Sequence, residues 1–219
     1  MKFVVAVLLI FISLLLHAQS QTSVKAAEDL KYLSEQFAND YLFLLYNPKH
    51  FKYIPKLQYT VKQMEDSLRI IAKNTHNEDI HSVLDYLSYT KDELKDLLDD
   101  DIDKENAEKV LDNADALVEG VDSILQSLHE NLSHAELRYH IAQLSRLYMA
   151  IHLKIDPAEN TKKLYHTLHI VDKMMQNINN NIYTTWHTYK TLFNPIPLYF
   201  VPHIVTIATE DLQESVSRL

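Results

Sequence analysis

Residues 137–155 read LRYHIAQLSRLYMAIHLKI, and the fold expected for the whole chain follows from this stretch. Large apolar side chains recur in it at alternating spacings of four and three residues, which is the pattern of one face of an α-helix. That face consists of Leu137, Ile141, Leu144, Tyr148, Ile151 and Ile155. We therefore expect an amphipathic helix that buries one face against neighbouring helices.

The same pattern occurs earlier in the chain, at residues 30–45, which read LKYLSEQFANDYLFLL. This segment aligns with residues 137–152 without a gap, at a constant shift that carries Leu30 onto Leu137 and that we call the long offset. The other identical pairs within it are Tyr32 and Tyr139, Gln36 and Gln143, and Tyr41 and Tyr148. At the long offset, the next expected helix pairs Lys56, Leu57 and Thr60 with Lys163, Leu164 and Thr167.

Later helices of the two halves also align, at a smaller shift that carries Leu117 onto Leu212 and that we call the short offset. At this offset Glu119 and Val121 match Glu214 and Val216. Three similar segments thus occur in the same order in both halves, which indicates an internal duplication. We expect two tandem four-helix-bundle units, residues 21–131 and 132–219, after a cleaved signal peptide.

The composition supports an all-α fold. Gly120 is the only glycine in 219 residues, and there is no cysteine. Glycine supplies the positive φ angles of phosphate-binding loops, dinucleotide fingerprints, nucleophile elbows and tight hairpins, so these motifs and hairpin-rich β structure are excluded. Without cysteine the chain has no disulfide, thiolate metal site or cysteine nucleophile, and the apolar core alone must hold the fold.

Apolar spacing and the positions of proline predict the helices in order. We expect them at residues 22–46, 56–74, 78–99, 104–131, 137–155 and 202–219, with a further helix that starts at Pro157 or Ala158 and runs to residue 182 and a short helix around Trp186 and Phe193. One boundary stays open. Residues 104–131 either continue into the next helix, because no proline or glycine divides them, or stop before a capping box formed by Ser133 and Glu136.

The N-terminal residues 1–20, MKFVVAVLLIFISLLLHAQS, have the three parts of a secretory signal peptide. Lys2 is the positive n-region, residues 3–16 are the apolar h-region, and Ala18-Gln19-Ser20 is a small-x-small cleavage site. The alternative is an uncleaved anchor, but the apolar run is shorter than the roughly 20 residues that span a bilayer. We expect cleavage after Ser20 and a periplasmic or secreted protein.

The net charge of the chain limits the kinds of partner that it is expected to bind. The formal net charge is −9, and removal of Lys2 with the signal peptide makes it −10. An acidic surface repels phosphate backbones and anionic lipid headgroups, so no nucleic-acid partner is expected.

Residues 30–41, LKYLSEQFANDY, resemble the opening motif QRMLSQRMAxxY of one sensor family, with Leu33, Ser34 and Ala38 kept. That family is the N-terminal, PilJ-like sensor domain of type IV pili methyl-accepting chemotaxis transducers. Residues 137–149 resemble the same motif, with Arg138 at its first arginine position and the LYM ending at residues 147–149. Trp186 and residues 197–216 resemble the close of exported proteins built from two such domains.

The resemblance implies a sensor fold for a small ligand. In related nitrate-sensing domains, an arginine on this helix holds the anion between subunits. The two arginine positions of the motif are Lys31 and Gln36 in the first copy and Arg138 and Gln143 in the second, and the motif's glycine is absent from both. These four residues are the candidate ligand-binding residues, for a small anionic ligand such as an oxyanion. The alternative is a solvated helix face, since a lysine is a point charge and a glutamine is uncharged.

The sequence contains two candidate metal sites. His166 and His169 stand three residues apart and face one side of a helix, but a ferritin-like bundle needs Glu-x-x-His pairs that this sequence lacks, and scattered exposed histidines are the favoured interpretation. A calcium loop from Asp101 needs glycine at its sixth position and glutamate at its twelfth, where Asn106 and Asp112 stand.

The sequence contains no catalytic constellation, so neither an enzyme nor a cofactor is expected. Three functions are considered. The first is an exported, non-enzymatic sensor-like protein that binds a small ligand or a membrane receptor. The second is a structural or interaction protein that kept the bundle and lost the pocket, with an envelope protein or a second copy in a homodimer as partner. The third is a bundle that binds a metal or haem through histidine, with Met149 or Met174 as a further haem ligand.

Overall fold

The computed structural model describes residues 2–49, 52–75, 77–128, 134–178, 180–193 and 200–218, and for residues 2–19, 134 and 180 only the backbone. In this part the chain is helical and contains no strand, which confirms the expected all-α class. The elements are α1 (Lys2–Tyr46), α2 (Tyr53–Asn74), α3 (Glu78–Asp96), α4 (Lys104–Ser127), α5 (His134–His152), α6 (Pro157–Met175), α7 (Asn180–Tyr189), the 3-10 helix η1 (Lys190–Phe193) and α8 (Pro202–Ser217).

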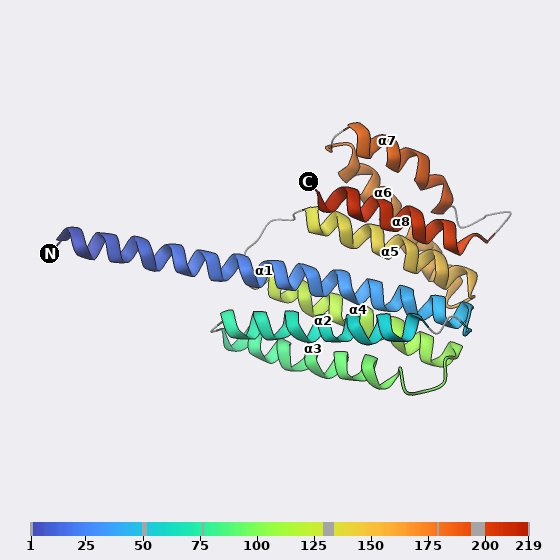
Figure 1. Ribbon diagram of the computed structural model, residues 1–219, viewed down its shortest axis with the longest axis horizontal. Coiled ribbons are helices and arrows are strands. Elements are labelled where there is room, and N and C mark those ends of the chain that lie inside the picture. Colours follow the sequence, from blue (N-terminus) through green and yellow to red (C-terminus); the bar gives the residue numbers. More distant parts are fainter. Residues whose placement is uncertain are drawn as a thin grey trace.

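The first helix is longer than the sequence predicted. It is continuous from Lys2 to Tyr46 through the expected cleavage site after Ser20, and its N-terminal part extends beyond the other helices (Figure 1). Within the described residues, no helix combines the length and the apolar character needed to cross a bilayer. The second helix begins at Tyr53 rather than at residue 56, because a proline such as Pro55 is tolerated in the first helical turn, where its missing N–H group has no partner to lose.

The open boundary in the middle of the chain is settled. Helix α4 ends at Ser127 and α5 begins at His134, and the two run in opposite directions, so they are not one long helix (Figure 1). Ser133, the expected capping residue, lies outside the described residues. Pro157 is the first residue of α6, which is one of the two starts expected from the sequence.

Helix α5 ends in a Schellman motif. The N–H of Lys154 donates to the carbonyl of Ile151 over 3.1 Å, and the N–H of Ile155 donates to that of Ala150 over 2.9 Å. Lys154 has a φ of 60°, a left-handed conformation that glycine usually supplies at this position. Ile155 is buried, and Asp156, with a φ of 33°, leads the chain into α6.

Each half of the chain is built around its first helix. Helix α1 packs against α2 and α4, and α5 packs against α6 and α8. The third helix of each half is peripheral, since α3 contacts α2 and α4 while α7 contacts α6 and α8. The two central helices pack against each other and run in the same direction, so one core extends through both halves (Figure 1).

Gly120 allows α3 and α4 to approach closely. A Cβ atom at this position would lie 2.5 Å from Cδ2 of Leu87, a residue of α3 with no exposed surface. That distance is shorter than any van der Waals contact, so a larger residue would have to displace Leu87. The glycine is therefore a packing residue here and not a turn residue.

We expect Gly120→Ala and Leu87→Ala to be strongly non-additive. Leu87→Ala alone leaves a cavity and should lower the free energy of unfolding by about 2–5 kcal/mol. In the double variant the new methyl group occupies part of that cavity and the alanine favours the helix, so the combined loss should be smaller than the sum of the single losses. Chemical denaturation of the three variants measures this, and additive losses would contradict the close contact.

Candidate functional site

The contact between α1 and α5 is reciprocal. Lys31 Nζ on α1 lies 3.0 Å from Oε1 of Glu136 on α5, and Arg138 Nη1 on α5 lies 3.5 Å from Oδ1 of Asp29 on α1. The long offset that aligns the two halves carries Asp29 onto Glu136 and Lys31 onto Arg138. Equivalent positions of the halves thus form ion pairs with each other, as in an interface around a two-fold axis.

The aromatic contacts repeat this reciprocity. The ammonium of Lys31 lies 4.2 Å from the ring centre of Tyr139, and the guanidinium of Arg138 lies 3.8 Å from that of Tyr32. Both are cation–π contacts, and the long offset also carries one tyrosine onto the other. Each candidate cation is therefore held by one ring and at least one carboxylate of the other half.

The four expected ligand-binding residues do not form one site. Lys31 is 4% exposed and contacts two carboxylates, those of Glu136 and of Asp122 at 2.9 Å. Gln143 is held by its own half, because its amide donates to Tyr139 Oη over 2.8 Å and its carbonyl accepts from Thr167 Oγ1 over 2.8 Å.

Gln36 and Arg138 do share a cavity, of about 500 Å³ at the surface between α1, α2 and α5. The carboxylates of Asp29 and Asp66 line the same cavity. Two carboxylates beside one guanidinium make it a poor site for an oxyanion. On the other side of the contact, burial opposes the ionisation of Glu136, but hydrogen bonds from His140 and Lys31 outweigh it and lower the pKa of this carboxyl.

A buried ion network lies deeper between the same helices. Arg146 of α5 is 2% exposed, and its Nε lies 2.6 Å from Oε2 of Glu35, which has no exposed surface. Its Nη2 lies 2.9 Å from Oδ1 of Asp115 on α4, whose other oxygen accepts from Lys163 Nζ over 3.1 Å. Burial raises the pKa of the Glu35 carboxyl, and the adjacent guanidinium opposes that shift.

A second polar region lies between α1, α2, α5 and α8, and it contains a cavity of about 50 Å³. This is room for a few water molecules or a small polar group, at roughly 10–15 Å³ for each water. Lys56 Nζ donates to Oδ1 of Asp40 over 2.9 Å at its edge. The lining residues are Tyr32, Gln36, Asn39, Asp40, Lys56, Ala142, Ser145, Thr206, Thr209, Glu210 and Gln213.

Buried oxygen atoms around this cavity lack partners among the described residues. They are Oδ2 of Asp40, Oδ1 of Asn39 and Oγ of Ser145. Asp40 is 2% exposed and Ser145 is fully buried. A buried acceptor without a partner costs free energy, so a cavity next to three of them is suited to a molecule that donates hydrogen bonds.

Asp40 is the titratable group of this cavity with the clearest shift. Burial raises its pKa from 3.8 to about 6, although Lys56 acts in the opposite direction. The folded protein therefore holds this proton more tightly than the unfolded chain between about pH 4 and pH 6. The stability that Asp40 contributes is present below its unfolded pKa and is lost as the pH rises through 6.

We expect Asp40→Asn to remove this pH dependence. As the pH rises from 4 to 7, the variant should gain up to about 3 kcal/mol in unfolding free energy relative to the unmodified protein, because the amide has no charge to bury. Thermal or chemical unfolding across this pH range measures the difference. Asp66→Asn is the control, since that side chain is 47% exposed. A difference that stays constant with pH would contradict the buried, titrating Asp40.

We expect the Arg146–Glu35 pair to be far costlier to break than to replace. Arg146→Met alone leaves the Glu35 carboxylate buried and poorly compensated, and should lower the unfolding free energy by about 3–5 kcal/mol. Arg146→Met with Glu35→Gln should recover much of this loss. Equal losses in the single and double variants, measured by denaturation at neutral pH, would show that the buried charge is not the cause.

The histidine and calcium candidates do not form sites in the described part of the chain. Both His166 and His169 are exposed, and no group of three or more His, Cys, Asp or Glu side chains there is arranged to hold a metal ion. His169 lines a separate surface cavity of about 480 Å³ between α6 and α7, next to Trp186. There Trp186 Nε1 donates to Asp172 Oδ1 over 2.9 Å, which lowers the pKa of that carboxyl.

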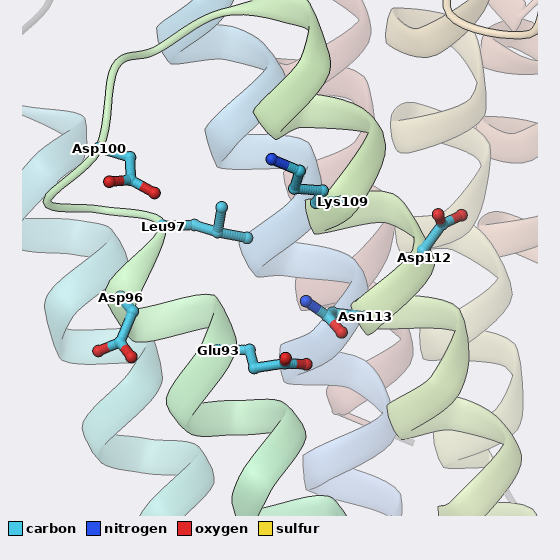
Figure 2. A pocket seen from close by; sticks show the side chains of 7 residues that line it. All are labelled: Glu93, Asp96, Leu97, Asp100, Lys109, Asp112 and Asn113. Carbon is cyan, nitrogen blue, oxygen red and sulfur yellow. The ribbon is translucent and has the colours of Figure 1, made fainter.

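The acidic connector starts a helix. Asp103 caps α4 by accepting from the N–H of Asn106 over 2.8 Å, and the Asn106 amide donates to the carbonyl of Asp101 over 2.9 Å. A surface cavity of about 490 Å³ lies nearby between α3 and α4, and Figure 2 shows its carboxylates spread over both sides rather than converging on one point. Its lining residues are Glu93, Asp96, Leu97, Asp100, Lys109, Asp112 and Asn113.

Sequence reasoning missed Glu35, Asp40 and Arg146, the most deeply buried charges of the two polar regions. A signal was present, because residues 144–151, LSRLYMAI, are apolar nearly all round the helix. Such a helix is buried on all sides, and a charged residue within it must then find a partner in the interior.

Comparisons with protein-family models, with curated proteins and with solved structures found no match for this chain.

Proposed function

We propose that the chain is an exported, non-enzymatic, sensor-like helical protein that binds a small polar ligand in the cavity between α1, α2, α5 and α8. The observation that carries the proposal is a cavity lined by three buried oxygen atoms, of Asp40, Asn39 and Ser145, that lack partners among the described residues. Buried atoms of Glu35 and Arg146 also lack a hydrogen bond of normal geometry, but the ion pair between them compensates their charges. A protein interior selects against such atoms unless water or a ligand satisfies them. The cavity beside them provides the room for such a molecule.

The position of this cavity suits a sensor. Its lining comes from α1 and α2 of the first half and from α5 and α8 of the second. A ligand there contacts both halves at once and favours whichever arrangement of α1 and α5 fits it best. Binding can then change the relative position of the halves, and a partner such as a membrane receptor can detect that change.

The reciprocal contacts support the proposal that the two halves are tandem copies. The ion pairs and the cation–π contacts each pair a position in one half with its equivalent in the other. We place the division between residues 21–131 and 132–219, and the signal peptide at residues 1–20. The projecting N-terminal part of α1 lies outside the packed helices, where a peptidase can reach it (Figure 1).

The same contacts argue against an oxyanion at the expected site. Lys31 and Arg138 are already paired with carboxylates, and an incoming anion would have to displace them or bear their repulsion. The ligand site is therefore better placed in the deeper cavity, where the unpartnered atoms are.

A second candidate function is that of a structural or interaction protein. It is favoured by the use of both candidate cations as bridges between α1 and α5, where they hold the halves together and leave no charge for a ligand. In that case the cavity contains only water. A stoichiometric envelope partner or a homodimer would then be the binding partner.

Native mass spectrometry of the protein purified from its source tests the proposal. We expect a mature chain that begins at Gln21 and carries an additional small mass that is lost on denaturation. Ser145→Leu, which fills the cavity with an apolar side chain, should abolish the added mass while circular dichroism shows the helices intact. A mature protein with no bound molecule, recovered with one stoichiometric partner, would favour the structural candidate instead.

A further inference from the structure

The cavity between α1, α2, α5 and α8 has a counterpart in the ion network between α1, α4, α5 and α6, which we call the filled region. At the long offset Asn39 corresponds to Arg146, and Glu35 corresponds to Ala142. The cavity is thus lined by a short amide and a methyl group at the positions where the other region has a guanidinium and a carboxylate.

The remaining charges are matched between the two regions. Lys56 corresponds to Lys163 at the long offset, and Asp115 corresponds to Glu210 at the short offset. Each lysine donates to a buried or half-buried carboxylate, Lys163 to Asp115 and Lys56 to Asp40. The lysine and one carboxylate of the filled region are therefore present around the cavity, without its arginine and without the Glu35 carboxylate, while Asp40 stands at the position equivalent to Leu147.

The filled region and the cavity differ in the sum of their formal charges. In the filled region the carboxylates of Glu35 and Asp115 face the cations of Arg146 and Lys163, so the formal charges cancel. Among the described residues that line the cavity, Asp40 and the exposed Glu210 are acidic and Lys56 is the one basic residue, which leaves one formal negative charge when both carboxyls are ionised. A single cation would restore the balance found in the filled region.

The unpartnered atoms point to the same kind of molecule. Oδ2 of Asp40 and Oδ1 of Asn39 are acceptors only, and Oγ of Ser145 accepts as well as donates. A ligand with several N–H groups can satisfy all three, whereas an oxyanion has no hydrogen to offer them and would face the uncompensated carboxylate.

We infer that this cavity binds a small organic cation through a guanidinium or primary ammonium group, which takes the place that the Arg146 side chain occupies in the filled region. The inference rests on the proposed ligand-binding function and specifies its ligand class. The charged group lies between Asp40 and Glu210, and the rest of the ligand extends toward the surface.

Calorimetric titration of the full mature chain with methylguanidinium at millimolar concentration tests the inference, with methylammonium as the second cation. Urea is the matched control, because it has nearly the shape of guanidinium without the charge. Nitrate and acetate form the anion arm. We expect one binding site for methylguanidinium and no binding of urea, nitrate or acetate.

Two conservative variants locate the site. Asp40→Asn and Glu210→Gln should each weaken methylguanidinium binding about 10-fold or more, the usual effect of losing one charge-assisted hydrogen bond. Asp66→Asn, a carboxylate of the neighbouring surface cavity, should leave binding unchanged. Unchanged affinity in both cavity variants would overturn the inference.

A third variant rebuilds the filled region inside the cavity. Asn39→Arg with Ala142→Glu places a guanidinium and its carboxylate at the positions equivalent to Arg146 and Glu35 of the filled region. We expect this variant to fold and to lose methylguanidinium binding. Retained binding in the folded variant would show that the cation lies elsewhere, and the melting temperature and circular dichroism spectrum report whether it is folded.

The outcomes separate this inference from the proposed function. If nitrate or acetate binds and the cations do not, or if the source protein carries an anionic or neutral molecule, the ligand class is wrong and the binding function stands. If no member of the panel binds and the source protein carries no small molecule, both fail and water alone fills the cavity.

Discussion

The Arg146 guanidinium is held between Glu35 and Asp115 where α1, α4 and α5 meet, and the position of the two central helices depends on this contact. A buried guanidinium can keep its charge only where carboxylates meet it at hydrogen-bonding distance, so α1 and α5 cannot slide along each other without exposing an unpaired charge to the interior. The apolar stripes of the two helices are non-directional and would permit several registers. The ion network, together with the reciprocal pairs nearer the helix starts, selects one of them.

The two polar regions between α1 and α5 differ in the residues that occupy equivalent positions. In one polar region the arginine and its carboxylate fill the space, and in the other region small residues at the equivalent positions leave a cavity. The charged layer between α1 and α5 thus contains an ion network in one region and a cavity in the other. The cavity also contains Asp40, the carboxyl whose pKa burial raises to about 6 although Lys56 contacts it.

Lys31 and Arg138 show that a charged residue next to an apolar stripe can have two roles, to bind a ligand or to join two helices. From the sequence, both were candidates to hold an anion. In the folded chain each is paired with a carboxylate and stacked on a tyrosine of the other half, and these contacts join the helices. Sequence periodicity placed the two side chains on the correct helices, but their partners come from the other half of the chain, as with Lys31 and Glu136. Local patterns carry no information about such distant pairs.

The sequence by itself determined the all-α class and the approximate position of each helix, because the spacing of apolar residues and the places of proline and glycine act within one or two helical turns. It also showed the similarity between residues 30–45 and 137–152, which needs only alignment. Tertiary structure alone decided that the equivalent helices lie side by side and parallel, that Glu35, Asp40 and Arg146 are buried, and that a cavity lies opposite the filled polar region. These features depend on which faces of helices far apart in the sequence meet. The hydrophobic effect drives that packing, but it is proportional to the buried apolar area and does not specify which helix packs against which.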